Sequence, residues 1–395
     1  MTILDEAAAI AGDLTALRRD LHREPEIGLQ LPKTQDRVLR AIEGLPLSVS
    51  TGEKLTSVTA VLTGGGPGPT VLLRADMDAL PVAEETGVPY ASATGHAMHA
   101  CGHDLHTAML AGAARLLSKR KDTINGNVVF MFQPGEEGLA GARHMIDEGV
   151  LTAAGETGVS AAYALHVFSD IPYAQFQVRP GPMMANSDAL DVTVRGRGGH
   201  ASLPHKGADP VPVICEIVTA LQTMVTRKFD IFEPVVLTVG SLHAGTARNV
   251  IPDEARFEGT VRSYAEETRK RVEEESVRLV RNIASGYGLE ADVRFERRYP
   301  VTVNDPAEAA FALETARDLF TEDRAAVRPH PLPGGEDFSY VLREVPGAFL
   351  FLGACPPDAD PAGAPSNHSA RAVFDDGVLA DGAALLAELA LRRLR

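Results

Sequence analysis

Residues 128–138 read Val-Val-Phe-Met-Phe-Gln-Pro-Gly-Glu-Glu-Gly, a short apolar run that stops at a proline and a glycine. Such a run is typical of a strand buried on both faces of a parallel sheet. Similar runs at 71–73 and 161–167 read as strands, and 104–119 reads as a helix between strands. The alternation predicts an α/β fold whose mostly parallel sheet is flanked by helices and binds ligands at the carboxyl ends of its strands.

The chain has 395 residues, more than one hydrophobic core usually supports, so two domains are expected. From about Leu190 apolar and polar residues alternate, as in a half-exposed antiparallel strand. We predict an inserted, smaller α+β domain at 187–297 and a catalytic domain made of 1–186 and 298–395. The expected elements of the insertion are strands at 190–194, 235–239 and 256–261 and helices at 211–224 and 266–283.

The composition excludes several classes of protein. Hydrophobic residues make up 45% and charged residues 23%, as in ordinary globular proteins. The net charge of −15 comes without a basic block, so no nucleic-acid partner is expected. Three scattered cysteines, an N-terminus without a signal-peptide pattern, and no run near the roughly 18 apolar residues of a membrane span predict a cytoplasmic protein outside the membrane.

Residues 99–106 read His-Ala-Cys-Gly-His-Asp-Leu-His, directly before the predicted helix. Cys101 and His103 stand on either side of a glycine, so both side chains can reach one ion from a turn, with the cysteine held as thiolate. The alternative is a loop of solvated histidines, which three histidines and a cysteine in eight residues make less favourable. His99 and His106 can support the ligands or lie at the surface.

Two adjacent carboxylates, Glu136 and Glu137, follow the strand of residues 128–132. Neighbouring side chains at a strand's end point in different directions, so one carboxylate can bind metal while the other faces the reacting water as general base. We predict Glu137 as the ligand and Glu136 as the base. An exposed acidic turn is the alternative, and this motif gains weight only from the others.

Two more histidines and two aspartates complete the candidates in the catalytic domain. His166 lies near the end of the apolar strand 161–167, where a satisfied core histidine is the alternative, and His368 lies in the polar loop Ser366-Asn367-His368-Ser369. Asp76 and Asp78 end another strand and are expected to support the ligands.

In the insertion, His200 and Asn249 lie on turns marked by glycine or proline. Structural turns are the alternative; as functional residues they would steady the oxyanion or hold the substrate.

These motifs, in this order, resemble the amidohydrolase branch of the aminoacylase and carboxypeptidase superfamily of metal-dependent peptidases, which includes hippurate hydrolase and the plant indole-acetyl-amino acid hydrolases. The resemblance extends from Leu21-His22-Arg23-Glu24-Pro25-Glu26 to Ser366-Asn367-His368. It implies that the metals are held by the Cys-Gly-His turn, the second glutamate of the pair, a histidine on a later strand and a late histidine. These positions match Cys101, His103, Glu137, His166 and His368, and the first glutamate, matching Glu136, is the implied base.

The resemblance also implies an inserted satellite domain that acts as a lid and often dimerises, and hence a homodimer or higher homo-oligomer. His200 and Asn249 would then act near the cleft, the histidine in cis or across a dimer interface. The wider superfamily usually has a metal-binding histidine at the place of Asp76. Here both Asp76 and Asp78 are aspartate, as suits the amidohydrolase branch, and the role of Asp76 stays open.

The resulting prediction is a di-metal amidohydrolase that cleaves N-acyl or aroyl amino acids to a carboxylic acid and a free amino acid. Two divalent ions, with the Cys101 thiolate at or near their shared position, polarise the carbonyl and acidify a water whose proton Glu136 takes. The donors suit zinc, manganese, cobalt or nickel. The alternatives are a dipeptidase or carboxypeptidase using the same site, a non-catalytic peptide- or metal-binding relative, and a single structural zinc with a closed four-ligand shell.

Overall fold

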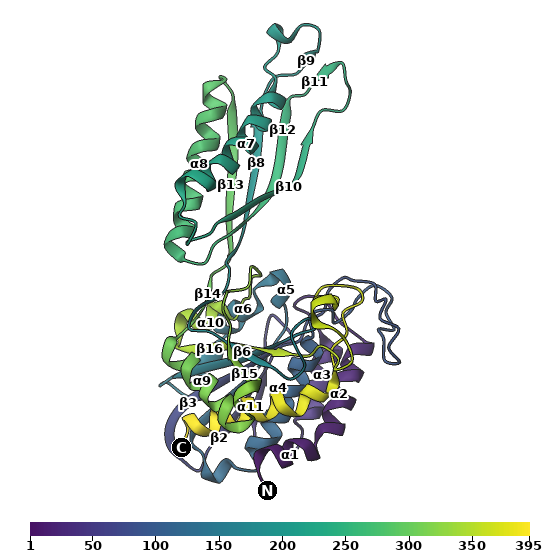
Figure 1. Ribbon diagram of the computed structural model, residues 1–395, viewed down its shortest axis with the longest axis vertical. Helices are drawn as coiled ribbons and strands as arrows, with labels where there is room; N and C mark the ends of the chain where they lie inside the picture. Colours follow the sequence, from purple (N-terminus) through teal and green to yellow (C-terminus); the bar gives the residue numbers. More distant parts are fainter. The chain divides into compact units, whose positions relative to one another are not determined.

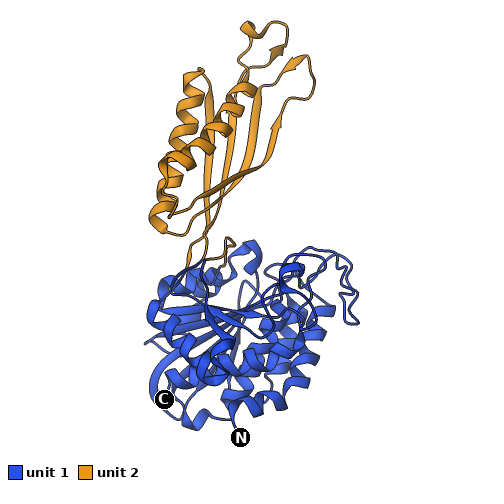
Figure 2. Cartoon of the chain, viewed as in Figure 1, with its two compact units in different colours: residues 1–183, 303–330, 337–395 blue, residues 184–302, 331–336 orange.

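The computed structural model describes residues 1–395 and divides them into two compact units, coloured blue and orange in Figure 2. The predicted insertion, residues 187–297, lies within the sequence range of unit 2, whose main segment begins at Met184 and ends at Thr302. Unit 1 comprises Met1–Met183, Val303–His330 and Asp337–Arg395, and unit 2 comprises Met184–Thr302 and Pro331–Glu336.

Unit 1 is built on an eight-stranded sheet with the order β1-β2-β4-β3-β5-β16-β6-β15. The four central strands, β4, β3, β5 and β16, run parallel, whereas β2 is antiparallel to β4 and β6 is antiparallel to β16. The predicted α/β class with a mostly parallel sheet is therefore confirmed. The strands are β1 (Ser48–Thr51), β2 (Val58–Thr63), β3 (Gly66–Asp76), β4 (Asn125–Gln133), β5 (Ala161–Phe168), β6 (Phe176–Val178), β15 (Ala325–Val327) and β16 (Gly347–Gly353).

Helices cover both faces of this sheet (Figure 1). The central one is α4 (His103–Ser118), which is buried along nearly its whole length and packs against β3, α2 and α11. Its alanines and the glycine at 112 allow this close approach, because a Cβ at 112 would lie 2.9 Å from that of Ala383 in α11. The other helices of unit 1 are α1 (Ile3–Ala9), α2 (Ala11–Arg23), α3 (Pro32–Ala41), α5 (Glu136–Leu139), α6 (Gly141–Asp147), α9 (Pro306–Leu319), α10 (Ser339–Glu344) and α11 (Leu379–Arg393).

The sheet brings several chain segments to one edge. Since β3, β4, β5 and β16 run parallel, the residues that follow them gather at their common carboxyl ends. Asp76 ends β3, Gln133 ends β4 and Phe168 ends β5. The loops after these strands carry most of the residues singled out from the sequence.

Some elements escaped prediction because they carry little hydrophobic pattern. The strand β1 is exposed at all four positions, and β6 and β15 have three residues each, too few for a period to appear. Their pairing is decided by the neighbouring strands and not by their own sequence.

Unit 2 is an antiparallel four-stranded sheet, order β10-β12-β8-β13, with its own hydrophobic core against the helices α7 and α8. Its strands and helices are β8 (Ser187–Arg195), α7 (Pro210–Lys228), β10 (Val236–Ala244), β12 (Glu254–Arg262), α8 (Glu266–Gly286) and β13 (Glu290–Tyr299), and two short strands, β9 (Gly199–His200) and β11 (Val250–Ile251), pair with each other. In neither unit does a helix have the length and apolarity needed to cross a membrane.

We expect the buried valines of the central sheet to carry much of the stability of unit 1. Val128→Ala in β4, at a fully buried position, should lower the free energy of unfolding by about 1.5–3 kcal/mol, the value of burying a valine side chain. Val49→Ala in β1, at a position 44% exposed, is the matched control and should change it by less than about 0.5 kcal/mol. Urea unfolding followed by circular dichroism measures both, and equal effects would contradict the observed burial.

Candidate metal centre

The Cys-Gly-His turn lies where α4 begins. Gly102 has a φ of 83°, a left-handed conformation that favours glycine, and a Cβ there would lie 2.3 Å from Cγ2 of Val167. This turn leads from the buried Cys101 into the first residue of α4, His103. The glycine thus lets two donor side chains face the same space, as the sequence predicted.

Cys101 lies at the centre of the cluster. Its Sγ is 3.4 Å from Nε2 of His166 on β5 and 3.3 Å from Nε2 of His368. The His368 Nε2 is in turn 3.3 Å from Oε1 of Glu137. Donor atoms from four segments far apart in the sequence therefore meet around one sulfur.

The five predicted ligands form two triads that share Cys101. One contains Cys101, His103 and His166, the other Cys101, Glu137 and His368, and within each triad the donor atoms lie within 4.8 Å of one another. A further group of three, His103, Glu136 and Glu137, places the predicted base beside both triads. The structure thus brings all five predicted ligands together with Glu136.

The donor atoms are oriented as metal ligands require. Nδ1 of His103 donates to the Asp78 carbonyl at 2.8 Å, and Nδ1 of His166 donates to the Val167 carbonyl at 2.9 Å. Backbone bonds of this kind fix which ring nitrogen carries the proton and turn the other toward the ion. Nε2 of His103 is buried and has no hydrogen-bond partner, a costly state that a cation would relieve.

The electrostatics of the cluster favour a cation. The Cys101 and Glu137 side chains raise the pKa of His368 to about 10. Burial works against a charge on His103, but Asp76 and Cys101 outweigh it and hold the pKa of His103 well above its usual range. Both shifts reflect the negative charge around these two histidines, and a divalent ion would be attracted by the same charge, so the residues present fit a metal centre.

His166 shows the opposite shift. Burial, together with the neighbouring His106, holds its pKa well below the usual value. A neutral imidazole has a lone pair free for a metal, and this histidine is in the form a ligand needs.

The two glutamates lie on the short helix α5, whose backbone is irregular. Glu137 has φ −71° and ψ 76°, and Ala140 has a φ of 54°. Asp78 holds this segment, because its carboxylate accepts the backbone N–H groups of Glu136 at 2.9 Å and Glu137 at 3.0 Å. Glu136 is buried, with 7% of its surface exposed, which excludes the exposed acidic turn.

Asp76 contacts residues that lie next to the candidate metal ligands. Its carboxylate bonds Nδ1 of His106 and Nη1 of Arg74, both at 2.5 Å, and lies 3.6 Å from Nε2 of His103. Burial would raise the pKa of Asp76, but Arg74 and the two histidines hold it well below the usual value. His106 completes a chain of contacts, since its Nε2 accepts the backbone N–H of Val167 at 2.8 Å.

His99 is buried, and neither of its ring nitrogens has a hydrogen-bond partner. It does not belong to any of the groups whose donor atoms could share a metal ion.

His200 and Asn249 belong to unit 2. The short strands β9 and β11 pair His200 with Val250, and the N–H of Ala201 donates to the Asn249 carbonyl at 3.1 Å. Both residues are exposed, and Nδ1 of His200 lies 2.7 Å from Oγ of Ser202. The structure thus brings these two predicted residues to adjacent positions of unit 2.

The sequence analysis did not identify a group of buried charged residues next to the Cys101 cluster. Arg18 and His22 of α2 both contact Asp104, the residue that follows His103. Arg18 and His22 are four residues apart and so lie on one face of a helix, which was the available signal in the sequence. Their shared partner, Asp104, lies 82 positions beyond His22, so no local pattern could identify it.

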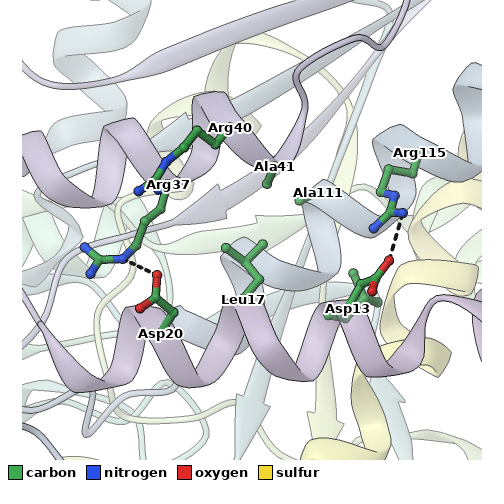
Figure 3. Close-up of a pocket in the computed structure, with 9 residues that line it drawn as sticks. Asp13, Leu17, Asp20, Arg37, Arg40, Ala41, Ala111 and Arg115 are labelled. Atoms are coloured by element: carbon green, nitrogen blue, oxygen red, sulfur yellow. Dashed lines mark hydrogen bonds and ion pairs between the residues drawn. The ribbon is translucent and has the colours of Figure 1, made fainter.

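A separate hollow of about 260 Å³ lies between α2, α3 and α4 (Figure 3). Four of its five charged side chains pair with one another, Asp20 with Arg37 at 2.6 Å and Asp13 with Arg115 at 3.0 Å. None of the donor groups that could hold a metal ion lines this hollow.

The chain is similar to known proteins over most of its length. The chain is 38% identical to thermostable carboxypeptidase 2 of Saccharolobus solfataricus, over 95% of this chain and 94% of that protein. It is 34% identical to the hippurate hydrolase of Campylobacter jejuni over the full length of both.

A solved structure extends this similarity to three dimensions. The dinuclear metal-binding peptidase of the M20 family from Bacillus subtilis superimposes with a TM-score of 0.84 at 34% identity, covering 98% of this chain and 99% of the other. The family model named peptidase family M20/M25/M40 matches residues 72–392, which include all five residues of the two triads and Glu136. Sequence, fold and family model agree over most of the chain, which therefore belongs to the peptidase family M20/M25/M40.

Proposed function

We propose that this chain is a two-metal amidohydrolase that cleaves N-acyl amino acids, with Cys101, His103, Glu137, His166 and His368 as metal ligands and Glu136 as general base. The observation that carries the proposal is the sharing of Cys101 by two triads of donor atoms, with Glu136 beside them. One closed structural zinc site would need four ligands and leave the fifth donor unused. Five donors in two overlapping groups fit two ions.

The ions, when bound, polarise the scissile carbonyl and lower the pKa of the attacking water. The side chains of the protein bind the ions and transfer the proton. Cys101, held between two histidines, supplies a soft anionic donor, which suits zinc, cobalt or nickel, and manganese fits the carboxylate and imidazole donors.

Glu136 takes the proton of the attacking water and passes it to the leaving amine. A general base must lie within hydrogen-bond reach of its proton, and Glu136 is held beside the donor cluster by the Asp78 carboxylate at its backbone N–H. A purely binding protein has no need of a second carboxylate at this place, which disfavours the non-catalytic alternative.

Unit 2 completes the proposal. His200 would steady the oxyanion and Asn249 would hold the substrate, with the histidine acting in cis or across a dimer interface. The unit would serve as the lid and as the surface through which copies of the chain assemble. The expected location of the enzyme is the cytoplasm.

A carboxypeptidase or dipeptidase is the second candidate, favoured by the similarity to a carboxypeptidase of Saccharolobus solfataricus. The same ions and base would serve it, so the two activities differ only in the groups that hold the substrate. The similarity to a hippurate hydrolase over the full length of both chains supports the acyl amino acid instead.

Parallel assays of N-acetyl and N-benzoyl amino acids and of dipeptides should separate these candidates. We expect kcat/KM to be higher for an acyl amino acid than for a dipeptide with the same C-terminal residue. The matched pair shares the carboxylate and the scissile amide and differs at the acyl group. A dipeptide preferred over every acyl partner would establish the peptidase.

Glu136→Gln should lower kcat by about 10²–10⁴-fold, the usual contribution of general acid–base catalysis, because the amide cannot accept the proton. Metal content should stay at the wild-type value. Glu137→Gln is the matched control one residue away and should lose metal, since it removes a ligand. Elemental analysis measures the metal content of each variant. If Glu136→Gln kept the wild-type kcat at unchanged metal content, the assignment of the base would be refuted.

Metal titration of the depleted protein should reach two divalent ions per chain. With cobalt, a thiolate-to-metal absorption band should appear and should be absent in Cys101→Ser, with Cys355→Ser as the control. Because His368 without metal holds its proton up to a pKa of about 10, the apparent affinity should increase as the pH rises. Saturation at one ion would contradict the two-metal centre.

A further inference from the structure

A buried arginine outside the cluster contacts two carboxylates. Arg18 of α2 is 1% exposed. Its Nε lies 2.7 Å from Oδ2 of Asp104, and its Nη1 lies 2.9 Å from Oδ1 of Asp376. The mechanism uses none of these three groups, although burying an ion pair this deeply is expensive unless its geometry is good.

The first carboxylate belongs to a segment that carries a ligand. Asp104 follows His103 directly and lies in the first turn of α4. His22, one turn after Arg18 on α2, adds a second contact through Nδ1 at 2.8 Å to the same Oδ2. Gly102, at the N-cap of α4, provides no side-chain hydrogen bond to hold the first turn of this helix. The contacts of Arg18 and His22 with Asp104 hold that turn instead, and the turn carries His103.

The second carboxylate belongs to the other ligand-bearing segment. Asp376 lies between His368 and α11, and Arg19 contacts its Oδ2 at 2.8 Å. This segment also contacts the first one directly, since the N–H of His368 donates to the Ala100 carbonyl at 2.8 Å. Arg18 therefore joins the turn of Cys101 and His103 to the segment of His368.

An arginine is suited to such a junction. Its rigid planar fork can bond two carboxylates in fixed directions, whereas a lysine ammonium is a point charge on a flexible stem. Groups that orient the ligands of a metal matter because ligands must be held to within about 0.5 Å of their working positions.

We propose that Arg18 is a positioning residue of the metal centre, which acts through Asp104 and Asp376 to hold His103 and His368 where they share ions with Cys101. The inference rests on the proposed function, because it concerns the affinity of the same ions. Arg18 is not proposed to contact the substrate. The expected effect of replacing it is therefore a weaker affinity for the metal ions.

The same two helices provide a matched control. Asp13 of α2 and Arg115 of α4 also form an ion pair (Figure 3). The paired atoms lie 3.0 Å apart, and the two side chains are 67% and 33% exposed. Exposed pairs of this kind contribute little to stability. Arg115→Met therefore removes an arginine between α2 and α4 that pairs with Asp13 and not with Asp104 or Asp376.

The test measures metal dissociation constants of the full-length chain by competition with a chromogenic chelator. Arg18→Met should weaken binding of zinc or cobalt by about 10–100-fold, the range for groups that orient metal ligands. Arg18→Lys should restore the affinity only in part. Arg115→Met should bind as the wild type does.

Thermal unfolding with and without metal separates positioning from simple support of the fold. A ligand stabilises by RT ln(1 + [L]/Kd), so weaker binding reduces the increase in melting temperature that metal produces. Arg18→Met should show a smaller increase than the wild type. A purely structural arginine would lower both melting temperatures equally and leave the increase unchanged, which would overturn the proposal.

Asp376→Asn covers the case in which Arg18→Met does not fold. Its side chain is 14% exposed, and the Arg18–Asp104 pair is kept. A weaker metal affinity in this folded variant supports the proposal, and wild-type affinity in both Asp376→Asn and Arg18→Lys would refute it. A wild type that binds no metal would instead refute the proposed function, so the two failures are distinguishable.

Discussion

The contact of one buried sulfur with two imidazoles is the constraint on which the arrangement of the donor cluster depends. Sγ of Cys101 lies 3.4 Å from Nε2 of His166 and 3.3 Å from Nε2 of His368, and this cysteine is not part of a disulfide. Anionic and neutral donors this close, some without hydrogen-bond partners, are stable only if positive charge lies among them. In the proposed enzyme, two ions supply that charge.

Backbone groups do much of the positioning. Asp78 holds the N–H groups of both glutamates, and its own carbonyl orients His103. Val167 similarly orients its neighbour His166 through its carbonyl and His106 through its N–H. Contacts of this kind hold the two aspartates at the end of β3 beside the donor cluster. Asp78 bonds the backbone of Glu136, and Asp76 bonds Arg74 and His106.

The division of the chain separates two tasks. The donors and Glu136 all belong to unit 1, whereas His200 and Asn249 belong to unit 2 and come together on its paired short strands. A unit with its own sheet and core can vary its exposed loops without disturbing the donor cluster. In the proposed enzyme, the chemistry would thus be fixed in one unit while substrate choice depends partly on the other.

The sequence by itself determined the α/β class, the family and the residue types of the centre. Strong local patterns carry this information: the apolar run of β4, the glycine between Cys101 and His103, and the adjacent glutamates. The helix α4 and the strand β5 were predicted to within one residue at each end. The local sequence around His368 gave little indication of a metal ligand. The family resemblance, which the family model confirms, identified this histidine as a candidate.

Only the tertiary structure decided which distant groups meet. The sharing of Cys101 by two triads, the hold of Asp78 on the glutamates and the junction of Arg18 with Asp104 and Asp376 join residues separated by tens to hundreds of positions. No local period encodes such contacts, because they follow from the order of strands in the sheet and the packing of α2 on α4. Chain pattern fixes which donors exist, and packing fixes their distances, on which the binding of a metal depends.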